Sequence, residues 1–361
     1  MSGHRFKVKT ERLLLSYSIE MVGVHMRKSN CSVAGTHMFQ QVVRLPEQIE
    51  FSLSSLFFNI RRTSKFAICG MGTCAIAGEV VSDYMDDKGA HPISVIRGLE
   101  LPRWVDSDTT VLVISYSGDT PEALHNYRSA VRKGAQVICV TSGGELEELC
   151  VKDDNVLMSI PYGFQSRGAL GYMIGYIVVA LHYCGLIDSY EDFKGALPSV
   201  KAYRDELIKD DNNEARRIAR FIGNRSPVVY GFFNMRATML RWKYQFNENS
   251  KVLSFCGTFP EFNHNELVGW TSDMLTDRFV PVVLMDDSVS QMLKYMAETP
   301  IGMLSDNGTE AYIHHLQGDC LLTNTLRGII LGDLTSLYLA HLKNVDPNVI
   351  DASDDTVGMP E

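Results

Sequence analysis

The sequence predicts an α/β protein with two domains, each built on a mostly parallel sheet flanked by helices. Short apolar segments of strand length alternate with helical patterns, which is typical of parallel strands joined by crossover helices. This alternation occurs twice, on either side of a polar stretch at residues 191–210. The length of 361 residues also favours two domains.

The first domain is predicted to cover residues 46–190, after an N-terminal arm at residues 1–45 that shows no clear period. Its strands are short apolar runs, and its helices carry apolar residues at helical spacing. We expect strands at 66–70, 93–97, 110–117, 136–141 and 156–161, and helices at 46–56, 75–85, 121–133 and 144–150.

An apolar segment at residues 168–187 is long enough to span a membrane and contains Gly171 and Gly175 in GxxxG spacing. However, tyrosines are spread along it, His182 lies inside it, and no second segment of this kind follows. We therefore expect a helix buried at a domain or subunit interface.

The second domain is predicted to cover residues 211–361, after a helical linker at 191–210, and to end in an acidic tail at 351–361. It repeats the alternation of the first domain. We expect strands at 227–232, 251–256, 279–285 and 310–316, helices at 213–222, 289–299 and 321–342, a helix that ends near Glu248 and another that begins near His264.

Composition and charge exclude several classes of protein. With 45% hydrophobic and 21% charged residues, the chain has the composition of a soluble globular protein. A net charge of −9 without any Lys/Arg run argues against nucleic acid as a partner. An anionic ligand must therefore be held by local groups rather than by the overall field of the protein.

The eight cysteines form no CxxC pair, which indicates reduced, buried thiols in a cytoplasmic protein. The first residues are basic and polar and do not resemble a signal peptide. No set of His, Cys, Asp and Glu residues has the spacing of metal ligands, so we expect no metal. His314 and His315 are adjacent on a predicted strand and must face opposite sides of it.

The first candidate anion site is a glycine turn between a strand and a helix. Gly70 and Gly72 lie in this turn and are followed by Thr73 and Cys74. Backbone N–H groups at such a helix N-terminus can hold a phosphate. The turn is not a dinucleotide fingerprint, because Ala75 stands at the third glycine position, and it lacks a Walker lysine.

The second candidate anion site contains Ser115, Ser117 and Thr120 at another strand-to-helix turn. Thr120 is expected at the N-cap position, with Pro121 at the first helical position. Capping explains Thr120 but not the two serines at alternate positions. Three hydroxyl groups and the unpaired helix N–H groups can hold a phosphate dianion without a lysine.

Glu248 is the candidate general base. Apolar residues at helical spacing predict a helix in front of it, with Asn234 capping the first turn. These apolar residues are Met235, Met239, Trp242 and Phe246. Glu248 falls in the last turn, where the helix dipole disfavours an ionised carboxylate, and a carboxylate of this kind suits proton abstraction. A solvated surface residue is the alternative, which the local sequence leaves open.

Six segments carry a resemblance to a known family. They are GMGTCAIAGE (70–79), SYSGDTPEAL (115–124), SRGALGY (166–172), QFNENSK (245–251), PEFNHNELVGW (260–270) and GDLTSLYLAHLKNVDP (332–347). Over residues 45–350 the chain is similar to the archaeal and bacterial bifunctional phosphoglucose/phosphomannose isomerases, which are built from two sugar isomerase (SIS) domains.

The resemblance implies an aldose–ketose isomerase that interconverts glucose 6-phosphate, mannose 6-phosphate or both with fructose 6-phosphate. This intramolecular oxidoreductase would work through a cis-enediolate without a cofactor, as a cytoplasmic homodimer in glycolysis and gluconeogenesis. The phosphate group of the substrate is expected to contact Gly72, Thr73, Cys74, Ser115, Ser117 and Thr120.

The catalytic residues implied by the resemblance are Glu248, Arg167, His264 and Lys343. Glu248 would move a proton between C2 and C1, and Arg167 would stabilise the enediolate. His264, from a second subunit, and Lys343 would open the sugar ring. Glu261 and Glu266, which flank His264, are competing candidates for the base.

Ser336 is expected to contact the substrate. It lies two helical turns from Lys343 on one face of the last helix, so both side chains can face one pocket. A small Ser336 or Thr335 would leave room for either C2 epimer.

Two departures from the family pattern affect the predicted site. Thr73 and Cys74 stand where the family usually has glycine and serine, and a thiol is a weaker donor than a hydroxyl group. Ser166 and Gly168 replace a proline and an alanine beside Arg167. The alternatives are a non-catalytic SIS protein that senses a sugar phosphate, and an aminosugar-phosphate isomerase or deaminase.

Overall fold

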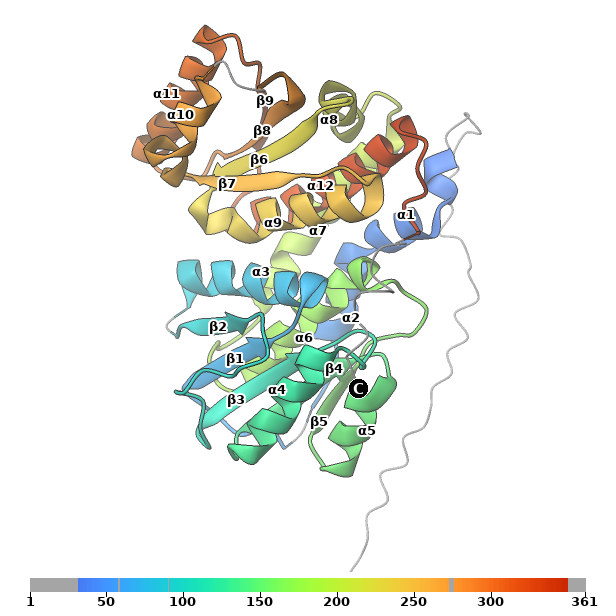
Figure 1. The fold of residues 1–361 in the computed structure, drawn as a ribbon. Coiled ribbons are helices and arrows are strands. Elements are labelled where there is room, and N and C mark those ends of the chain that lie inside the picture. The colour runs from blue at the N-terminus through green and yellow to red at the C-terminus, as the bar shows by residue number, and fades with distance from the viewer. Residues whose placement is uncertain (1–31, 58, 90, 273–275, 350–361) are drawn as a thin grey trace, which may run out of the picture. The chain divides into compact units, whose positions relative to one another are not determined.

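The computed structural model describes residues 32–57, 59–89, 91–272 and 276–349. The predicted acidic tail and most of the predicted N-terminal arm therefore lie outside the described residues. Two parallel sheets with helices on both faces confirm the predicted α/β class (Figure 1).

The first sheet has the strand order β2-β1-β3-β4-β5, with all neighbours parallel. Its strands are β1 (Lys65–Cys69), β2 (Ile93–Ile96), β3 (Thr109–Ile114), β4 (Gln136–Thr141) and β5 (Val156–Ser159). One face packs against α4 (Pro121–Arg132) and α5 (Gly144–Lys152). Helices α3 (Gly72–Lys88) and α6 (Leu170–Tyr183) pack together on the other face (Figure 1).

The second sheet has the order β7-β6-β8-β9 and is also parallel. Its strands are β6 (Ser226–Phe232), β7 (Phe255–Phe259), β8 (Phe279–Asp286) and β9 (Tyr312–Leu316). One face packs against α10 (Glu266–Trp270) and α11 (Gln291–Asp306). The other is covered by α8 (Glu214–Ile222), α9 (Arg236–Ser250) and α12 (Leu321–Leu342) (Figure 1).

The predicted linker is a packed helix. Helix α7 (Glu191–Lys209) contains Pro198, and Phe193 and Val200 are buried on its apolar face. It contacts α2 (Leu45–Leu53) near one sheet and α12 near the other. Helix α1 (His37–Val42), inside the predicted arm, also packs against α12. The connection between the two sheets therefore contributes to the core.

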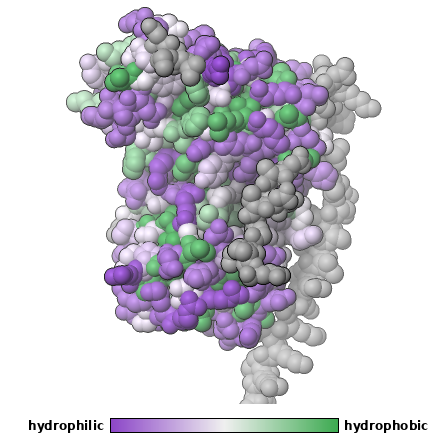
Figure 2. All heavy atoms as spheres, in the orientation of Figure 1, coloured by the Kyte–Doolittle hydropathy of each residue, from purple (hydrophilic) through white to green (hydrophobic). Residues whose placement is uncertain are grey.

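Helix α6 is buried as predicted, and within the chain it packs against α2 and α3. Its position at a subunit interface stays a prediction. Gly171 and Gly175 allow α2 to approach closely, because a Cβ at these positions would overlap the side chains of Gln48 and Ser52. No helix in the described ranges is long and apolar enough to cross a membrane. On the face shown in Figure 2, hydrophilic residues predominate and hydrophobic ones form smaller groups.

The strand predicted at residues 251–256 is wrong in its position. Lys251 adopts the left-handed conformation with a φ of 55° and ends α9, so the chain turns before the strand begins. Val252 is buried and Leu253 is 65% exposed, and neither pairs with β6. The ladder starts only at Phe255.

The predicted Asn234 cap is also wrong. Asn234 lies in the 3₁₀ turn η3 (Phe233–Met235), and α9 begins after this turn without a side-chain cap of its own. Asp83 of α3 accepts a hydrogen bond from the backbone N–H of Ala237 at 2.9 Å instead. Burial raises the pKa of Asp83 to about 7. A backbone N–H group in the first turn of α9 thus finds its hydrogen-bond acceptor on α3, in the other half of the molecule, and this bond holds α3 against α9.

Replacing Gly332 with alanine should destabilise the fold. A Cβ there would overlap the indole ring of Trp242, which is fully buried and donates a hydrogen bond to the Gly328 carbonyl. We expect G332A to lower the free energy of unfolding by about 1–3 kcal/mol, as overpacking of a core does. The measurement is denaturant-induced unfolding.

G302A is the matched control. Gly302 lies in α11, and a Cβ at this position would meet no other atom within 4 Å, so alanine should raise the stability by up to about 1 kcal/mol through its helix propensity. Equal stabilities of the two variants would contradict the packing described for α9 and α12.

Candidate functional site

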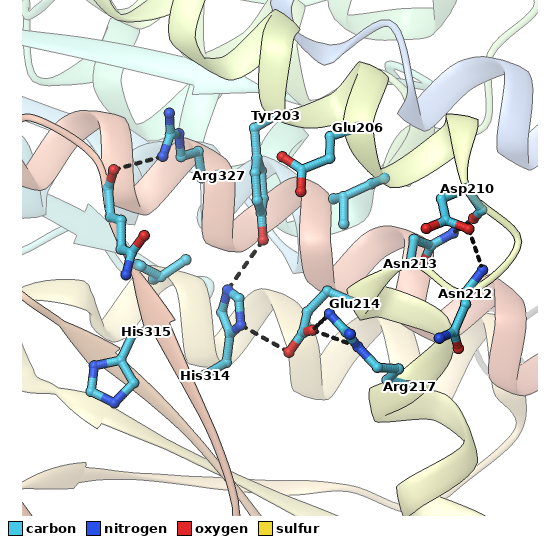
Figure 3. Close-up of a pocket in the computed structure, with 13 residues that line it drawn as sticks. Tyr203, Glu206, Asp210, Asn212, Asn213, Glu214, Arg217, His314, His315 and Arg327 are labelled. Atoms are coloured by element: carbon cyan, nitrogen blue, oxygen red, sulfur yellow. Dashed lines mark hydrogen bonds and ion pairs between the residues drawn. The ribbon is translucent and has the colours of Figure 1, made fainter.

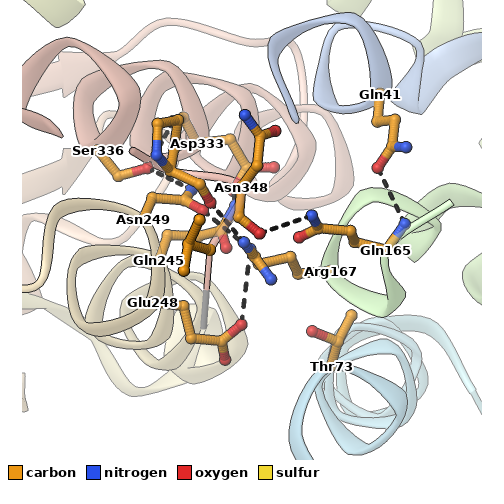
Figure 4. Close-up of polar contacts among 12 residues, drawn as sticks. Gln41, Thr73, Gln165, Arg167, Gln245, Glu248, Asn249, Asp333, Ser336 and Asn348 are labelled. Carbon is orange, nitrogen blue, oxygen red and sulfur yellow. Dashed lines mark hydrogen bonds and ion pairs between the residues drawn. The ribbon is translucent and has the colours of Figure 1, made fainter. Parts of the chain in front are cut away.

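Predicted site residues from both halves meet where α3, α9, α12 and the 3₁₀ turn η2 (Ser166–Gly168) pack together (Figure 4). Arg167 extends from η2 toward Glu248 of α9, and Thr73 lies nearby in the first turn of α3 (Figure 4). Residues far apart in the sequence therefore form one polar cluster between the two sheets.

Arg167 is only 3% exposed, and its guanidinium group is held on two sides. Nε donates to Asn249 Oδ1 at 2.9 Å, and Nη2 donates to the carbonyl oxygen of Pro347 at 2.5 Å. The pKa of Arg167 is lowered to about 10, chiefly by burial; Glu248 opposes this shift and Arg241 adds to it. The group remains a cation at neutral pH in a fixed orientation, as charge stabilisation in a reaction requires.

Glu248 lies in the last turn of α9, as predicted. Its side chain is 32% exposed, and Oε2 lies 3.7 Å from Arg167 Nε. The carboxylate is therefore open to a ligand on one side and beside a buried cation on the other. This combination allows it to exchange a proton with a ligand whose negative charge Arg167 stabilises.

The segment that follows α12 closes the site from the opposite side. Besides the contact of Pro347 with Arg167, the carbonyl oxygen of Asn348 accepts a hydrogen bond from Gln165 Nε2 at 2.9 Å. Lys251 Nζ donates to the carbonyl oxygens of Asp346 and Val349 at 3.1 and 2.5 Å. Residues 346–349 are thereby tied to both η2 and the end of α9.

A buried ion pair lies behind these residues, and the sequence alone did not reveal it. Arg241 of α9 donates Nε and Nη2 to the two carboxylate oxygens of Asp333 of α12, at 2.8 and 2.9 Å. Both residues are at most 1% exposed. Gln245 Nε2 also donates to Asp333 Oδ1 at 2.8 Å. The available signal was a single carboxylate in the middle of the apolar segment at 321–342.

The predicted second phosphate turn lies at the carboxyl end of β3. The hydroxyl groups of Ser115 and Thr120 are 2.9 Å apart, and the N–H of Gly118 donates to Ser115 Oγ at 3.1 Å. Thr120 occupies the predicted N-cap position, but its hydroxyl group bonds to Ser115 rather than capping α4. Gly118 has a φ of +83° and packs directly on Gly143, so the turn rests on the start of α5.

The predicted first phosphate turn lies at the start of α3, where Gly72 has a φ of +51°. Thr73 Oγ1 accepts a hydrogen bond from Arg241 at 3.4 Å. Cys74 is buried against the backbone of Tyr116 and the side chain of Ser166, and this burial raises the pKa of its thiol. The two turns and η2 are therefore neighbours, and Cys74 is a protonated packing residue.

Comparisons with known proteins identify the family of the chain. A bifunctional phosphoglucose/phosphomannose isomerase from Caldicellulosiruptor bescii is 32% identical over 329 residues, which cover 88% of this chain and 97% of that protein. The chain belongs to the bifunctional phosphoglucose/phosphomannose isomerase family. Residues 211–355 also match the family described as bacterial phospho-glucose isomerase C-terminal SIS domain.

Other similar proteins act on related molecules or share the fold. The D-glucosamine-6-phosphate 4-epimerase of Sulfolobus acidocaldarius is 29% identical over 257 residues, covering 69% of this chain and 77% of that protein. The solved C-terminal domain of glucosamine-fructose-6-phosphate aminotransferase from Francisella tularensis superposes with a TM-score of 0.69 at 14% identity. That match covers 88% of this chain and 99% of the solved one. At this identity the likeness shows the fold, which is that of SIS proteins.

Two residues predicted from the family resemblance are not joined to the cluster. His264 ends the 3₁₀ turn η4 (Glu261–His264) and is exposed, and Lys343 follows α12 at its C-cap. Within the described ranges, no hydrogen bond or ion pair connects either side chain to Arg167 or Glu248. Their catalytic roles stay predictions.

Ser336 lies beneath the site rather than on its surface. It is fully buried, accepts a hydrogen bond from Asn249 Nδ2 at 2.9 Å and donates to the carbonyl oxygen of Asp333 at 2.7 Å. Direct contact with the substrate stays a prediction. Of the competing bases, Glu266 accepts a hydrogen bond from Tyr230 at 2.5 Å, which explains it as a packing residue.

A separate cavity of about 340 Å³ lies between α7, α8 and β9 (Figure 3). His314 faces it and contacts Glu214 Oε1 through Nδ1 at 3.0 Å and the hydroxyl group of Tyr203 through Nε2 at 3.1 Å. His315 contacts Asp287 on another side, which confirms the predicted opposite orientations of the two histidines. The network joins the connecting helix α7 to the second sheet.

Low pH should weaken the hydrogen-bond network of Glu214, His314 and Tyr203 by protonating Glu214. The hydrogen bond with His314 is the main cause that lowers the pKa of Glu214 to about 2 in the folded protein. Stabilisation from a lowered carboxyl pKa is complete above the ordinary value and is lost as the pH falls toward the folded value. The difference in unfolding free energy between wild type and E214Q should therefore be constant above about pH 5 and shrink from there toward pH 2.

Denaturant unfolding at a series of pH values checks this expectation. E206Q is the control, because Glu206 is an exposed carboxylate on the same cavity. Parallel pH profiles for wild type and E214Q would contradict the role of Glu214.

Proposed function

We propose that this protein interconverts glucose 6-phosphate and mannose 6-phosphate with fructose 6-phosphate, as the names of its relatives indicate for those proteins. The observation that carries the proposal is the buried Arg167 cation 3.7 Å from the partly exposed carboxylate of Glu248. Aldose–ketose isomerisation needs these two groups, a base that moves one proton and a cation that stabilises the enediolate.

The reaction is a proton transfer between adjacent carbons. The phosphate group is held by Ser115, Ser117, Thr120 and the backbone at Gly72, Thr73 and Cys74. Glu248 removes the proton from C2, the electron pair forms the C1–C2 double bond, and the negative charge on O1 faces Arg167. The hydroxyl proton on O2 passes to O1, Glu248 returns its proton to C1, and O2 becomes the carbonyl oxygen at C2. Both epimers at C2 give the same enediolate, so one site can serve both sugars.

His264 and Lys343 are proposed to open the sugar ring before isomerisation, by moving a proton between the ring oxygen and O1. The exposure of His264 at the end of η4 supports its contribution to the site of a second subunit. We accordingly propose a cytoplasmic homodimer that acts in glycolysis and gluconeogenesis.

A second candidate substrate class is the aminosugar phosphates, because one relative is named a D-glucosamine-6-phosphate 4-epimerase. Consumption of glucosamine 6-phosphate, followed with and without ammonia release, separates an epimerase from a deaminase. Turnover of this compound without turnover of either hexose 6-phosphate would favour the second candidate.

Substitution of Glu248 with glutamine should abolish both hexose phosphate activities together. Because the amide has the shape of the carboxylate but cannot accept the proton, we expect kcat to fall by about 10²- to 10⁴-fold with either substrate. The measurement is coupled detection of fructose 6-phosphate formation. E261Q is the control, since Glu261 is exposed on η4 and should be dispensable. Near-normal turnover by E248Q would remove Glu248 as the base.

Mixing two inactive variants tests the shared site. In a hybrid dimer of E248Q and H264A, one site carries both substitutions and the other carries neither, provided that His264 crosses to the partner. Random exchange of subunits should then recover about a quarter of the wild-type specific activity. No recovery, with hybrids verified by native mass spectrometry, would mean that each site uses its own His264.

A further inference from the structure

We propose that Asp333, Asn249 and Ser336 are positioning residues that orient Arg167 through two hydrogen-bonded routes, one from the Asp333 carboxylate and one from the Asp333 backbone carbonyl oxygen. This inference rests on the proposed role of Arg167 in the isomerase reaction. Asp333 lies inside the apolar helix α12 and is 1% exposed. Its carboxylate bonds to Arg241 and Gln245, so its influence on Arg167 passes through other residues.

The first route holds the backbone of Arg167. The Asp333 carboxylate fixes the Arg241 guanidinium group through two parallel hydrogen bonds. Arg241 Nη2 then donates to the carbonyl oxygen of Arg167 at 2.7 Å. Its Nη1 reaches Thr73 Oγ1 at 3.4 Å, so the same cation also contacts the first phosphate turn. A planar guanidinium group is suited to this bridging because its donors keep fixed relative directions.

The second route holds the side chain of Arg167. The backbone carbonyl oxygen of Asp333, which does not depend on the side chain at this position, accepts a hydrogen bond from the Ser336 hydroxyl group, and Ser336 Oγ accepts from Asn249 Nδ2. Asn249 Oδ1 accepts from Arg167 Nε. The amide orientation of Asn249 follows from its partners, because a guanidinium N–H can only donate and therefore requires the oxygen of the amide.

Together the two routes close a ring from Asp333 through Arg167 and back to Asp333. Figure 4 shows the part of this ring formed by Arg167, Asn249, Ser336 and Asp333. Burial of an ion pair such as Arg241–Asp333 contributes little net stability compared with apolar residues. The pair is needed instead to hold the catalytic cation Arg167 in place, because small displacements of a catalytic group cause large losses of rate. The carboxylate route therefore gives the aspartate inside this apolar helix a function.

Ser336 takes a different role in this arrangement from the predicted contact with the sugar. A residue that touches the substrate changes KM and the preference between epimers. A residue that orients Arg167 changes kcat, and does so equally for glucose 6-phosphate and mannose 6-phosphate. The two roles can thus be separated by kinetics.

The experiment compares kcat and KM of wild type, D333N, N249A and S336A with both substrates. We expect kcat to fall about 10- to 100-fold in N249A, with KM nearly unchanged and the substrate preference retained. S336A and D333N should show the same pattern. N249A and S336A, which keep the Arg241–Asp333 pair, test the route through Asn249. D333N keeps the backbone carbonyl oxygen and tests the route through Arg241; because it leaves a buried arginine without its charge partner, its kcat is measured together with its circular dichroism spectrum, which shows whether it is folded.

S250A is the matched control. Ser250 is the neighbour of Asn249, is fully buried and donates to the carbonyl oxygen of Ser336 at 2.7 Å, but it does not bond to Arg167. Its replacement should lower the melting temperature about as much as S336A does and leave kcat at the wild-type value. A comparable loss of kcat in S250A would mean that general loosening of α9 and α12 causes the effect, which would overturn the proposal.

The R167A background separates this inference from the proposed function. If Asn249 acts through Arg167, then adding N249A to R167A causes no further loss of kcat. A wild-type rate in R167A would overturn the proposed role of Arg167 itself. A slow R167A combined with an unaffected N249A would overturn only the positioning role.

Discussion

The buried pair of Arg241 and Asp333 is the interaction on which the arrangement of the site depends. It connects α9 to α12 inside the second half of the chain, and through Arg241 it reaches η2 and α3 in the first half. Without its partner, either charge would remain desolvated in the protein interior at a cost of about 3–5 kcal/mol. Loss of either Arg241 or Asp333 should therefore disrupt the packing of α9 and α12 against η2 and α3. The pair thus fixes how the two halves of the chain pack together at this point.

The proposed binding of a phosphate group has to overcome the charge of the whole protein. The chain carries a net charge of −9, so its overall field repels a phosphate dianion. Local features oppose this repulsion: hydroxyl groups at one turn, the N-terminus of α3 at another, and two buried guanidinium groups behind them. Burial strengthens the field of these cations at short range because little water screens them. The proposed attraction of a phosphate group is therefore local to these turns.

The sequence was sufficient for the fold and for the position of Glu248, because both depend on local patterns. The apolar period through Met239, Trp242 and Phe246 defines the buried face of α9, and all three side chains are buried. The start of β7 could not be derived in this way, since a lysine with a φ of 55° ends the preceding helix without a glycine. Helix ends of this kind are set by tertiary contacts that leave no local signal.

Contacts between residues far apart in the chain likewise could not be predicted from the sequence. Asn234 has the residue type of a cap, yet the group that satisfies α9 is Asp83, 154 positions away from Ala237. Asp333 was visible as an anomaly in an apolar segment, but neither its partner nor its connection to Arg167 follows from spacing. Asn249 was visible in the sequence only as one residue of the QFNENSK motif that resembles the family. The contact between Asn249 and Arg167 became evident only from the three-dimensional structure.

The bond between Arg167 and the carbonyl oxygen of Pro347 joins residues 180 positions apart. Domains generally fold as units while the chain is being synthesised, with the N-terminal one first. The first sheet can therefore form on the ribosome long before its arginine finds its final partner. The site matures only when residues 346–349 have left the exit tunnel and settled over η2. A nascent chain of this protein thus lacks the complete cluster around Arg167 until residues 346–349 have emerged, although half of its fold is already in place.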